Sequence, residues 1–378
     1  MSYNQLRFIG GGRWAFIVLN ELIGIYPELK IDWICNSELI KKNEYIKNLP
    51  SFRNVKLVSP SHISKLSSPD KVIIASHSSH HCSDLSSHRN SAQILIEKPI
   101  FPFFQEFKNL SDDEKDQTFI NLEFYYAYFI TDFYNESKPI NLEIVEIIWH
   151  DPLEESRDGS EEKKYSEVFS SIFMDQLLHV ISIFKALDID PGHFKNIEIS
   201  IKNNKSNGSI NIECSCKGIL IKISLSRFAE FRERKVIVNN GAISLDFTSE
   251  PIINKNGNFY NEILIKKRLF PIAKTLDNFI SFPEKPDISS LSLRSLSPGI
   301  RFCFECEDLF TKIYSNYLDA YNTNIKSDVN INPYLTYYAG ICYYKNNIIF
   351  KNIQVNQYLK GTAGVKDLIS WWKSSISQ

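Results

Sequence analysis

The sequence predicts an α/β domain built on a parallel sheet, followed by an α+β domain with a large, mainly antiparallel open sheet. Over roughly residues 1–120, short apolar strands alternate with helical segments, which is typical of a parallel sheet covered by helices. Beyond residue 140, strand candidates follow one another across short turns rich in Asn and Gly, which predicts antiparallel pairing. The chain has 378 residues, 43% of them hydrophobic, so it can bury two cores.

The predicted elements run in order from a strand at residues 5–9, through three glycines, to a helix at 14–25 with apolar residues at helical spacing. We expect domains at 1–121 and 122–322 and a C-terminal extension, 323–378, that packs on the body. Further predicted elements of the first half are strands at 31–35, 55–58, 72–75 and 93–96, a polar helix at 38–47, and a loop or helix at 79–90. Those of the second half are strands at 141–149, 196–203, 209–216, 218–226, 234–239 and 242–247, and helices at 166–187, 269–281 and 299–321.

Charge and composition exclude several classes of protein. The formal net charge of −1 gives no strongly basic footprint, so no nucleic-acid partner is expected. There is no apolar run of about 18 residues and no signal peptide at the start, so no membrane segment is expected. Seven cysteines without a secretion signal are typical of reduced thiols in the cytoplasm. Cys303 and Cys306 form a lone C-x-x-C in a helical stretch, where packing explains them better than metal binding.

The first chemical signal is the segment Gly10-Gly11-Gly12-Arg13-Trp14-Ala15, which matches G-x-G-x-x-[G/A] between a predicted strand and a predicted helix. Glycines there allow a tight turn and a close approach of the backbone to a pyrophosphate, which faces the helix N-terminus. The segment therefore predicts a dinucleotide site, while an ordinary glycine turn before a helix is the simpler alternative.

The end of the second predicted strand bears on which dinucleotide is bound. An acidic residue at this place usually bonds the adenosine ribose, but the strand ends in Cys35-Asn36-Ser37, and Lys41 and Lys42 follow. Without a carboxylate a 2′-phosphate is not repelled, and the lysines can attract it, so NADP(H) is slightly favoured over NAD(H). Alternatively, Asn36 bonds a ribose hydroxyl and the lysines lie on a solvated helix face.

Two further signals carry acid–base chemistry. Glu97-Lys98-Pro99 closes a buried strand, and the carboxyl end of a parallel strand faces the crevice where ligands bind, so Lys98 is a candidate proton donor. Asp175 and His179 are four residues apart, and so share one face of a predicted apolar helix. They either satisfy each other in the core or line a pocket and handle a proton.

Together these segments resemble the Gfo/Idh/MocA family of NAD(P)-dependent oxidoreductases. The resemblance rests on the glycine loop, on Glu97-Lys98-Pro99 about ninety residues later and on Asp175-x-x-x-His179. The strand 72–75 fits as well, since the family's strand ends in Ala-Thr-Pro followed by a His. Ser76 stands at the Thr position and His77 replaces the Pro, with His81 as the later His. The similarity covers about residues 5–321.

The resemblance implies a Rossmann domain followed by a domain whose open sheet often mediates oligomerisation, so a homo-oligomer, either a dimer or a tetramer, is expected. It implies that Gly10, Gly11, Gly12, Arg13, Trp14, Asn36, Ser37, Ser76, His77, His81 and Glu97 line the cofactor site. Lys98 would contact both the nicotinamide ribose and the substrate. Asp175 and His179 would line the pocket for a small-molecule substrate, with His179 as the proton donor or acceptor.

The chain departs from the family pattern at several positions. Ser170-Ser171 and Leu177 replace glycines that are common before and within the Asp–His helix, so the pocket shape differs. The segment 119–126 replaces the usual Gly-Phe/Tyr-Asn-Arg-Arg. In that segment Glu123, Tyr125 and Tyr126 are candidate substrate-binding residues, although strand aromatics more often belong to the core.

The function that this resemblance implies is hydride transfer between a nicotinamide cofactor and a carbonyl or secondary alcohol of a sugar or nucleotide-sugar. One alternative is reduction of an imine or conjugated double bond, as in thiazolinyl imine reductases. Another is a regulator that binds a dinucleotide without turning anything over. The presence of Lys98, Asp175 and His179 favours the enzyme.

Two other groups of residues are given simpler interpretations. His77, His80, His81 and His88 lie close in sequence, but ligand spacing is poor and no metal is expected. The stretch 227–234, Arg-Phe-Ala-Glu-Phe-Arg-Glu-Arg, has balanced charges and is interpreted as a solvated sheet edge.

Overall fold

The computed structural model forms two compact units, each assembled from separate segments of the chain. The first comprises Met1–Lys138, Ile181–Gly192 and Glu262–Arg301, and the second comprises Pro139–Val180, His193–Asn261 and Phe302–Gln378. The predicted cuts at residues 121 and 322 stay predictions. The residues that the structure describes are 5–35, 54–66, 69–88, 93–138, 140–152, 154–156, 163–165, 170–201, 208–260, 270–284, 286–321, 334, 337–338, 340–341 and 345.

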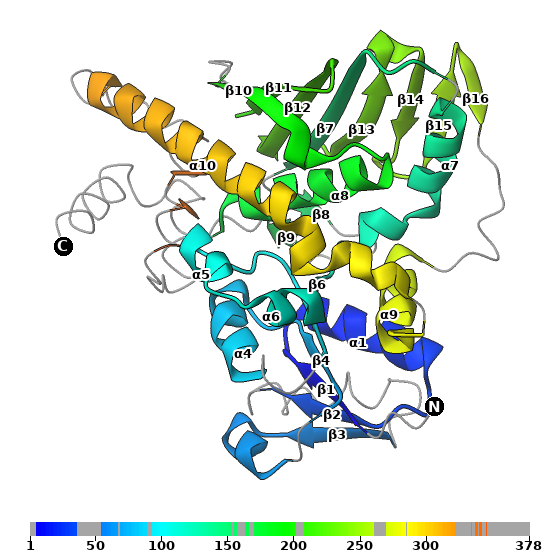
Figure 1. The fold of residues 1–378 in the computed structure, drawn as a ribbon, viewed down its shortest axis with the longest axis vertical. Coiled ribbons are helices and arrows are strands. Elements are labelled where there is room, and N and C mark those ends of the chain that lie inside the picture. Colours follow the sequence, from blue (N-terminus) through cyan, green and yellow to red (C-terminus); the bar gives the residue numbers. More distant parts are fainter. Residues whose placement is uncertain are drawn as a thin grey trace. The chain divides into compact units, whose positions relative to one another are not determined.

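The first unit is built on a six-stranded sheet with the order β3-β2-β1-β4-β5-β6, and every pair in it is parallel (Figure 1). This confirms the α/β prediction. The strand order reverses between β1 and β4, which is the point where ligands bind in open α/β sheets. The strands are β1 Leu6–Ile9, β2 Ile31–Ile34, β3 Val55–Val58, β4 Lys71–Ile74, β5 Gln93–Ile96 and β6 Thr118–Ile120.

Helices cover this sheet, as the alternating pattern predicts. Helix α1 (Arg13–Ile25) follows β1 directly, and its buried residues recur at helical spacing. It packs against α9 (Pro271–Ser281), which comes from far along the chain. The polar helix expected at 38–47 lies outside the described residues. The other helices that the structure describes before residue 140 are α4 His81–His88, α5 Phe104–Lys108, α6 Asp112–Gln117 and α7 Tyr128–Ser137, with 3₁₀ turns at Pro60–Lys65, Ser78–His80 and Glu123–Tyr126.

The second unit contains an eight-stranded sheet with the order β10-β11-β12-β7-β13-β14-β15-β16. Only β12 and β7 run parallel, and the other pairs are antiparallel, which confirms a mainly antiparallel sheet. Along β7, Val145, Ile147 and Trp149 are buried and alternate with half-exposed residues, so one face packs on the core. The strands are β7 Ile144–Pro152, β10 Phe194–Ile201, β11 Ile210–Cys216, β12 Ile219–Ala229, β13 Glu233–Val238, β14 Ile243–Asp246, β15 Ile252–Lys255 and β16 Asn258–Tyr260, with a separate pair β8 Glu154–Ser156 and β9 Lys163–Tyr165.

Three predicted elements are corrected by the structure. The helix expected at 166–187 opens with a π-helical turn, Phe173–Leu177, and only then continues as α8 (Leu178–Ala186). Helix α10 (Leu293–Tyr321) begins before the expected residue 299, because the chain stays helical through Pro298. The segment 119–126 is a strand only to Ile120 and continues as the 3₁₀ turn Glu123–Tyr126, so its tyrosines are not strand residues.

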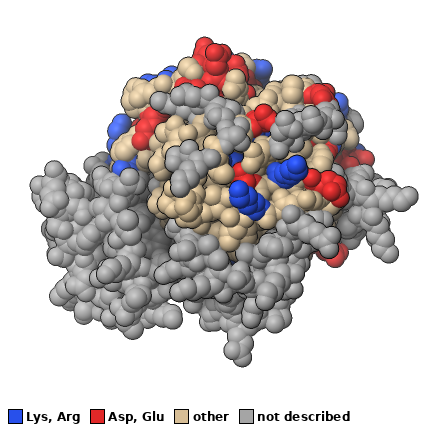
Figure 2. Space-filling model, turned by 90° about the horizontal axis from the view of Figure 1, so that it is seen from below, with Lys and Arg blue, Asp and Glu red and all other residues tan. Residues whose placement is uncertain are grey.

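Among the described helices, none has the combination of length and apolarity that crossing a bilayer requires. On the face in Figure 2, the described acidic and basic side chains are interspersed. Cys303 and Cys306 are fully buried in α10, and burial raises the pKa of both thiols, as expected for packing residues.

Candidate functional site

The turn after β1 requires glycine at its first position. Gly10 has a φ of +136°, and a Cβ built on it would lie 2.3 Å from the carbonyl oxygen of Ala75, which follows β4. The indole of Trp33 in β2 donates to the carbonyl oxygen of Gly10 at 2.7 Å. The turn is therefore held against the neighbouring strands at the point where the strand order reverses.

Gly12 has a different role, because it lies at the N-terminus of α1 beside open space. No atom lies within 4 Å of the place that a Cβ would take on Gly12, and no side chain caps the helix. Arg13 and Trp14, the first residues of the helix, are exposed. Free main-chain N–H groups in a first helical turn attract anions. This cradle, which a side chain would fill, fits the pyrophosphate of a dinucleotide.

The loop after β4 is tied to the loop after β5 by His81. This side chain is 1% exposed, and its Nδ1 and Nε2 lie 2.7 and 2.8 Å from the carbonyl oxygens of Pro99 and Ser76. Burial lowers the pKa of His81, and the two carbonyls oppose that shift. The Ser76 hydroxyl donates to Asp84 at 2.6 Å, and His77 is exposed. A direct contact of Ser76, His77 or His81 with a cofactor stays a prediction.

Glu97 connects the glycine turn to the end of β6. Its side chain is 6% exposed and accepts hydrogen bonds from the Trp14 indole and the Asn121 amide. Burial raises the pKa of Glu97 to about 7, although these two bonds and the charge of Lys98 oppose the shift. Lys98 follows, half-buried, at the same carboxyl edge of the sheet. The structure thus gathers Gly10, Trp14, Ser76 and Glu97, four of the predicted cofactor residues, at this edge.

The three substrate-binding candidates of the first unit lie in the turn that follows β6. Glu123, Tyr125 and Tyr126 are half-buried in the 3₁₀ turn after β6. Tyr126 donates to the carbonyl oxygen of Asp287 at 2.8 Å, and burial raises its pKa. Substrate binding by these three residues stays a prediction. Asn36 and Ser37, on which the choice between cofactors depends, lie outside the described residues.

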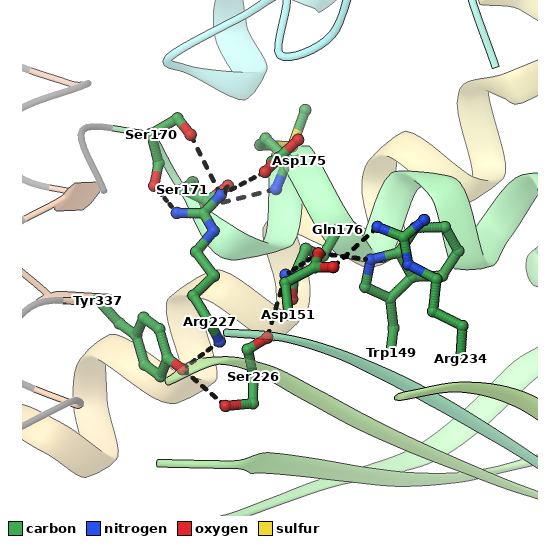
Figure 3. A network of polar contacts seen from close by, with 11 residues as sticks. Trp149, Asp151, Ser170, Ser171, Asp175, Gln176, Ser226, Arg227, Arg234 and Tyr337 are labelled. Carbon is green, nitrogen blue, oxygen red and sulfur yellow. Dashed lines mark hydrogen bonds and ion pairs between the residues drawn. The ribbon is translucent and has the colours of Figure 1, made fainter. Parts of the chain in front are cut away.

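In the second unit, Asp175 forms an ion pair with Arg227 (Figure 3). The carboxylate of Asp175 lies 2.7 Å from the guanidinium of Arg227, and the two side chains are 15% and 2% exposed. Arg227 also donates to the carbonyl oxygen of Ser170 at 2.9 Å and to its hydroxyl at 3.2 Å. The negative charge of Asp175 is therefore compensated within the protein. Asp175 lies in the π-helical turn, a feature that is frequent at functional sites.

His179, one turn further on, is oriented by aromatic stacking. Its ring stacks on Trp149 with centroids 5.0 Å apart and planes 12° apart, and His179 is 7% exposed. The guanidinium of Arg234 lies 4.3 Å from the Trp149 ring centre. Asp151 accepts hydrogen bonds from Trp149, Gln176 and Arg234 at 3.2, 3.1 and 2.8 Å. An imidazole fixed in this way can carry a proton without first reorienting.

The sequence interpretation of residues 227–234 is wrong. Strands β12 and β13 flank β7 inside the sheet, so this connection does not lie at a sheet edge, and Arg227 is buried. Arg227, Trp149, Trp33 and Asn121 were not predicted as site residues. The one available signal for Arg227 was an arginine beside a run of alternating apolar strand residues.

Comparison with known proteins relates this geometry to a fold. The sequence matches no protein-family model and no curated protein. UDP-N-acetylglucosamine 3-dehydrogenase from Acidithiobacillus ferrooxidans aligns with a TM-score of 0.61 at 13% identity, covering 81% of this chain and 97% of that chain. A Gfo/Idh/MocA family oxidoreductase from Vibrio cholerae aligns at 0.57 and 11%, covering 81% and 99%.

The chain has the fold of the Gfo/Idh/MocA oxidoreductases. Myo-inositol dehydrogenase from Lactobacillus casei, solved in complex with NAD(H) and myo-inositol, shares it with a TM-score of 0.55 at 17% identity, covering 79% of this chain and 94% of that chain. The predicted resemblance is thus confirmed at the level of the Gfo/Idh/MocA fold.

Proposed function

We propose that this chain is an NAD(P)-dependent oxidoreductase acting on a carbonyl or secondary alcohol of a sugar or nucleotide-sugar. The observation that carries the proposal is the uncapped N-terminus of α1 beside Gly12, at the reversal point of a Rossmann-type sheet. The likeness to folds solved with NAD(H) and myo-inositol, or named for a UDP-sugar, supports the substrate class.

In this proposal each part of the site has a separate task. The glycine turn and the first turn of α1 hold the pyrophosphate. Lys98 donates a hydrogen bond to the nicotinamide ribose and the substrate oxygen, and Glu97 fixes the loop on which it lies. A bound nicotinamide supplies or accepts the hydride. His179 gives or takes the hydroxyl proton, because its ring is held in one orientation, whereas Asp175 is paired with Arg227 and shapes the pocket.

The proposal extends to the choice between the two nicotinamide cofactors. NADP(H) is slightly favoured, since Asn36 stands where an acidic residue would repel a 2′-phosphate. The myo-inositol dehydrogenase from Lactobacillus casei was solved with NAD(H), which supports use of a nicotinamide cofactor in general. A preference for NADH in a parallel titration would reverse this part of the proposal.

The test is turnover by Lys98→Ala and His179→Gln, with NADPH and NADH offered against myo-inositol, UDP-N-acetylglucosamine and their oxidised forms. Loss of an acid–base group lowers turnover by at least about 10²-fold, while nucleotide affinity is mostly retained. Lys56→Ala on β3 and His193→Gln are matched controls, because both side chains are exposed and lie outside the site. Wild-type turnover in both site variants would refute the assignment. Nucleotide binding without turnover of imines or sugars by the wild type would favour the regulator.

A further inference from the structure

The C-terminal contact residues, Tyr334, Tyr337, Tyr338, Ile341 and Lys345, belong to the second unit. The first four are buried, and Lys345 is half-buried. The dehydrogenases cited above are covered to 94–99% of their length while matching 79–81% of this chain. This chain therefore carries residues that those folds do not match.

Tyr337 bonds the main chain of β12 where strand pairing is interrupted. Ser226 is paired with His150 and Ala229 with Pro152, with a shift of register between them, so Arg227 lies in a bulge. The N–H of Arg227 donates to the hydroxyl of Tyr337 at 2.8 Å (Figure 3). A buried N–H that the sheet does not pair needs such an acceptor.

The side chain of Arg227 connects the bulge to Asp175, a predicted residue of the substrate pocket. From the bulge, its side chain reaches the Ser170–Ser171 turn and the carboxylate of Asp175. Bulges re-aim side chains, and the position of the bulge decides where the guanidinium lies. A shift of the Arg227 main chain would therefore move the group that holds Asp175.

A second contact of the C-terminal residues reaches the same turn independently. Lys345 forms an ion pair at 2.7 Å with Glu307 of α10, whose side chain is 1% exposed. Glu307 accepts a hydrogen bond from Ser171, and the Ser171 carbonyl oxygen accepts from the N–H of Asp175 at 3.0 Å. Thus two separate chains of contacts connect the C-terminal residues to the turn of Asp175.

We propose that Tyr337 is a positioning residue, which acts through Arg227 to hold Asp175 in place, so that the C-terminal residues complete the substrate side of the site. The catalytic meaning of this inference rests on the proposed function. The physical link from Tyr337 to Asp175 does not, and it can be measured separately.

The experiment compares Tyr337→Phe with Tyr334→Phe in the full-length chain. Each variant removes one hydroxyl from the same group of residues and keeps the ring. Tyr334 donates to the carbonyl oxygen of Ser209 at 3.2 Å, near the start of β11 and away from the bulge at Arg227, so it is the matched control. Amide hydrogen exchange is followed by mass spectrometry on peptides covering residues 170–180.

In Tyr337→Phe, exchange at residues 170–177 is expected to become about tenfold faster, because the N–H of Arg227 loses its acceptor. In Tyr334→Phe it stays at the wild-type rate. On a substrate that the wild type turns over, the kcat of Tyr337→Phe is expected to fall about tenfold while its NADPH affinity is unchanged, because a residue of the substrate site is displaced. Equal acceleration in both variants means that the hydroxyls only stabilise the fold, and no acceleration in Tyr337→Phe means that the link is absent. Either result overturns the inference.

Failure of the proposed function is detected in the wild type alone, by titration with NADPH and NADH and by turnover of the sugars named above. If the wild type binds no nucleotide, the exchange rates still decide whether Tyr337 holds the turn of Asp175. If it turns over substrate and Tyr337→Phe keeps the wild-type kcat, the positioning role is refuted while the function stands.

Discussion

Gly10 and Gly12 should respond differently to substitution by alanine. In Gly10→Ala, the new methyl group would lie 2.3 Å from the Ala75 carbonyl oxygen, and the residue would keep a φ of +136°. Backbone strain costs roughly 1–3 kcal/mol and overpacking roughly as much again, so the free energy of unfolding should fall by about 2–6 kcal/mol. In Gly12→Ala, the φ is −76° and the methyl group meets open space. Its free energy of unfolding should stay within about 0.5 kcal/mol of the wild type.

The assay is urea denaturation followed by tryptophan fluorescence, together with NADPH titration of each folded variant. Gly12→Ala should bind NADPH at least about tenfold more weakly, because its methyl group occupies the cradle proposed for the pyrophosphate. Wild-type stability in Gly10→Ala would refute the geometry of the turn. Wild-type NADPH affinity in Gly12→Ala would refute the place assigned to the cofactor.

Three further predictions concern buried charges. Arg227→Met should lower the free energy of unfolding by about 3–5 kcal/mol in urea denaturation, because Asp175 loses its ion-pair partner. Arg232 is more exposed, and Arg232→Met should lower it by under about 1 kcal/mol. Equal losses in the two variants would contradict a stabilising ion pair between Arg227 and Asp175. Burial lowers the pKa of Lys71 from 10.5 to about 8, so the folded state loses this proton at a lower pH than the unfolded state does. The free energy of unfolding of the wild type, relative to that of Lys71→Met, should therefore rise with pH between about 8 and 10.5. Parallel curves of stability against pH for the two proteins would contradict this. Burial raises the pKa of Glu97 from 4.5 to about 7, so the stability that the protonated side chain contributes is full below pH 4.5 and is lost as the pH rises through 7. In chemical denaturation, Glu97→Gln should show a smaller decline of stability over this range than the wild type. An equal decline in both proteins would contradict the effect of burial.

The sequence predicted the features that depend on local pattern. The strand at 93–96 and the one at 55–58 have the bounds expected, because short apolar runs between polar turns leave few alternatives. The glycine turn was recognisable, since the conformation of Gly10 is needed by the turn itself.

The features that were missed depend on partners distant in sequence. Arg227 and Asp175 are 52 residues apart, and in sequence the arginine stands among balanced charges that are typical of solvent. The apolar pattern of the π-helical turn at Phe173–Leu177 does not differ from that of an α-helix, so the turn was predicted as part of an ordinary helix. Trp33 was assigned only as a strand residue, although its indole holds the Gly10 carbonyl oxygen. Tertiary contacts decide these roles, and local propensity does not contain them.

The most direct test of the account is a fluorescence titration of the folded wild-type protein with NADPH and with NADH in parallel. We expect saturable binding of at least one of them, with NADPH slightly tighter. Binding of neither by a protein shown to be folded would mean that the turn at Gly10 is only structural, and the proposal of an oxidoreductase would be contradicted.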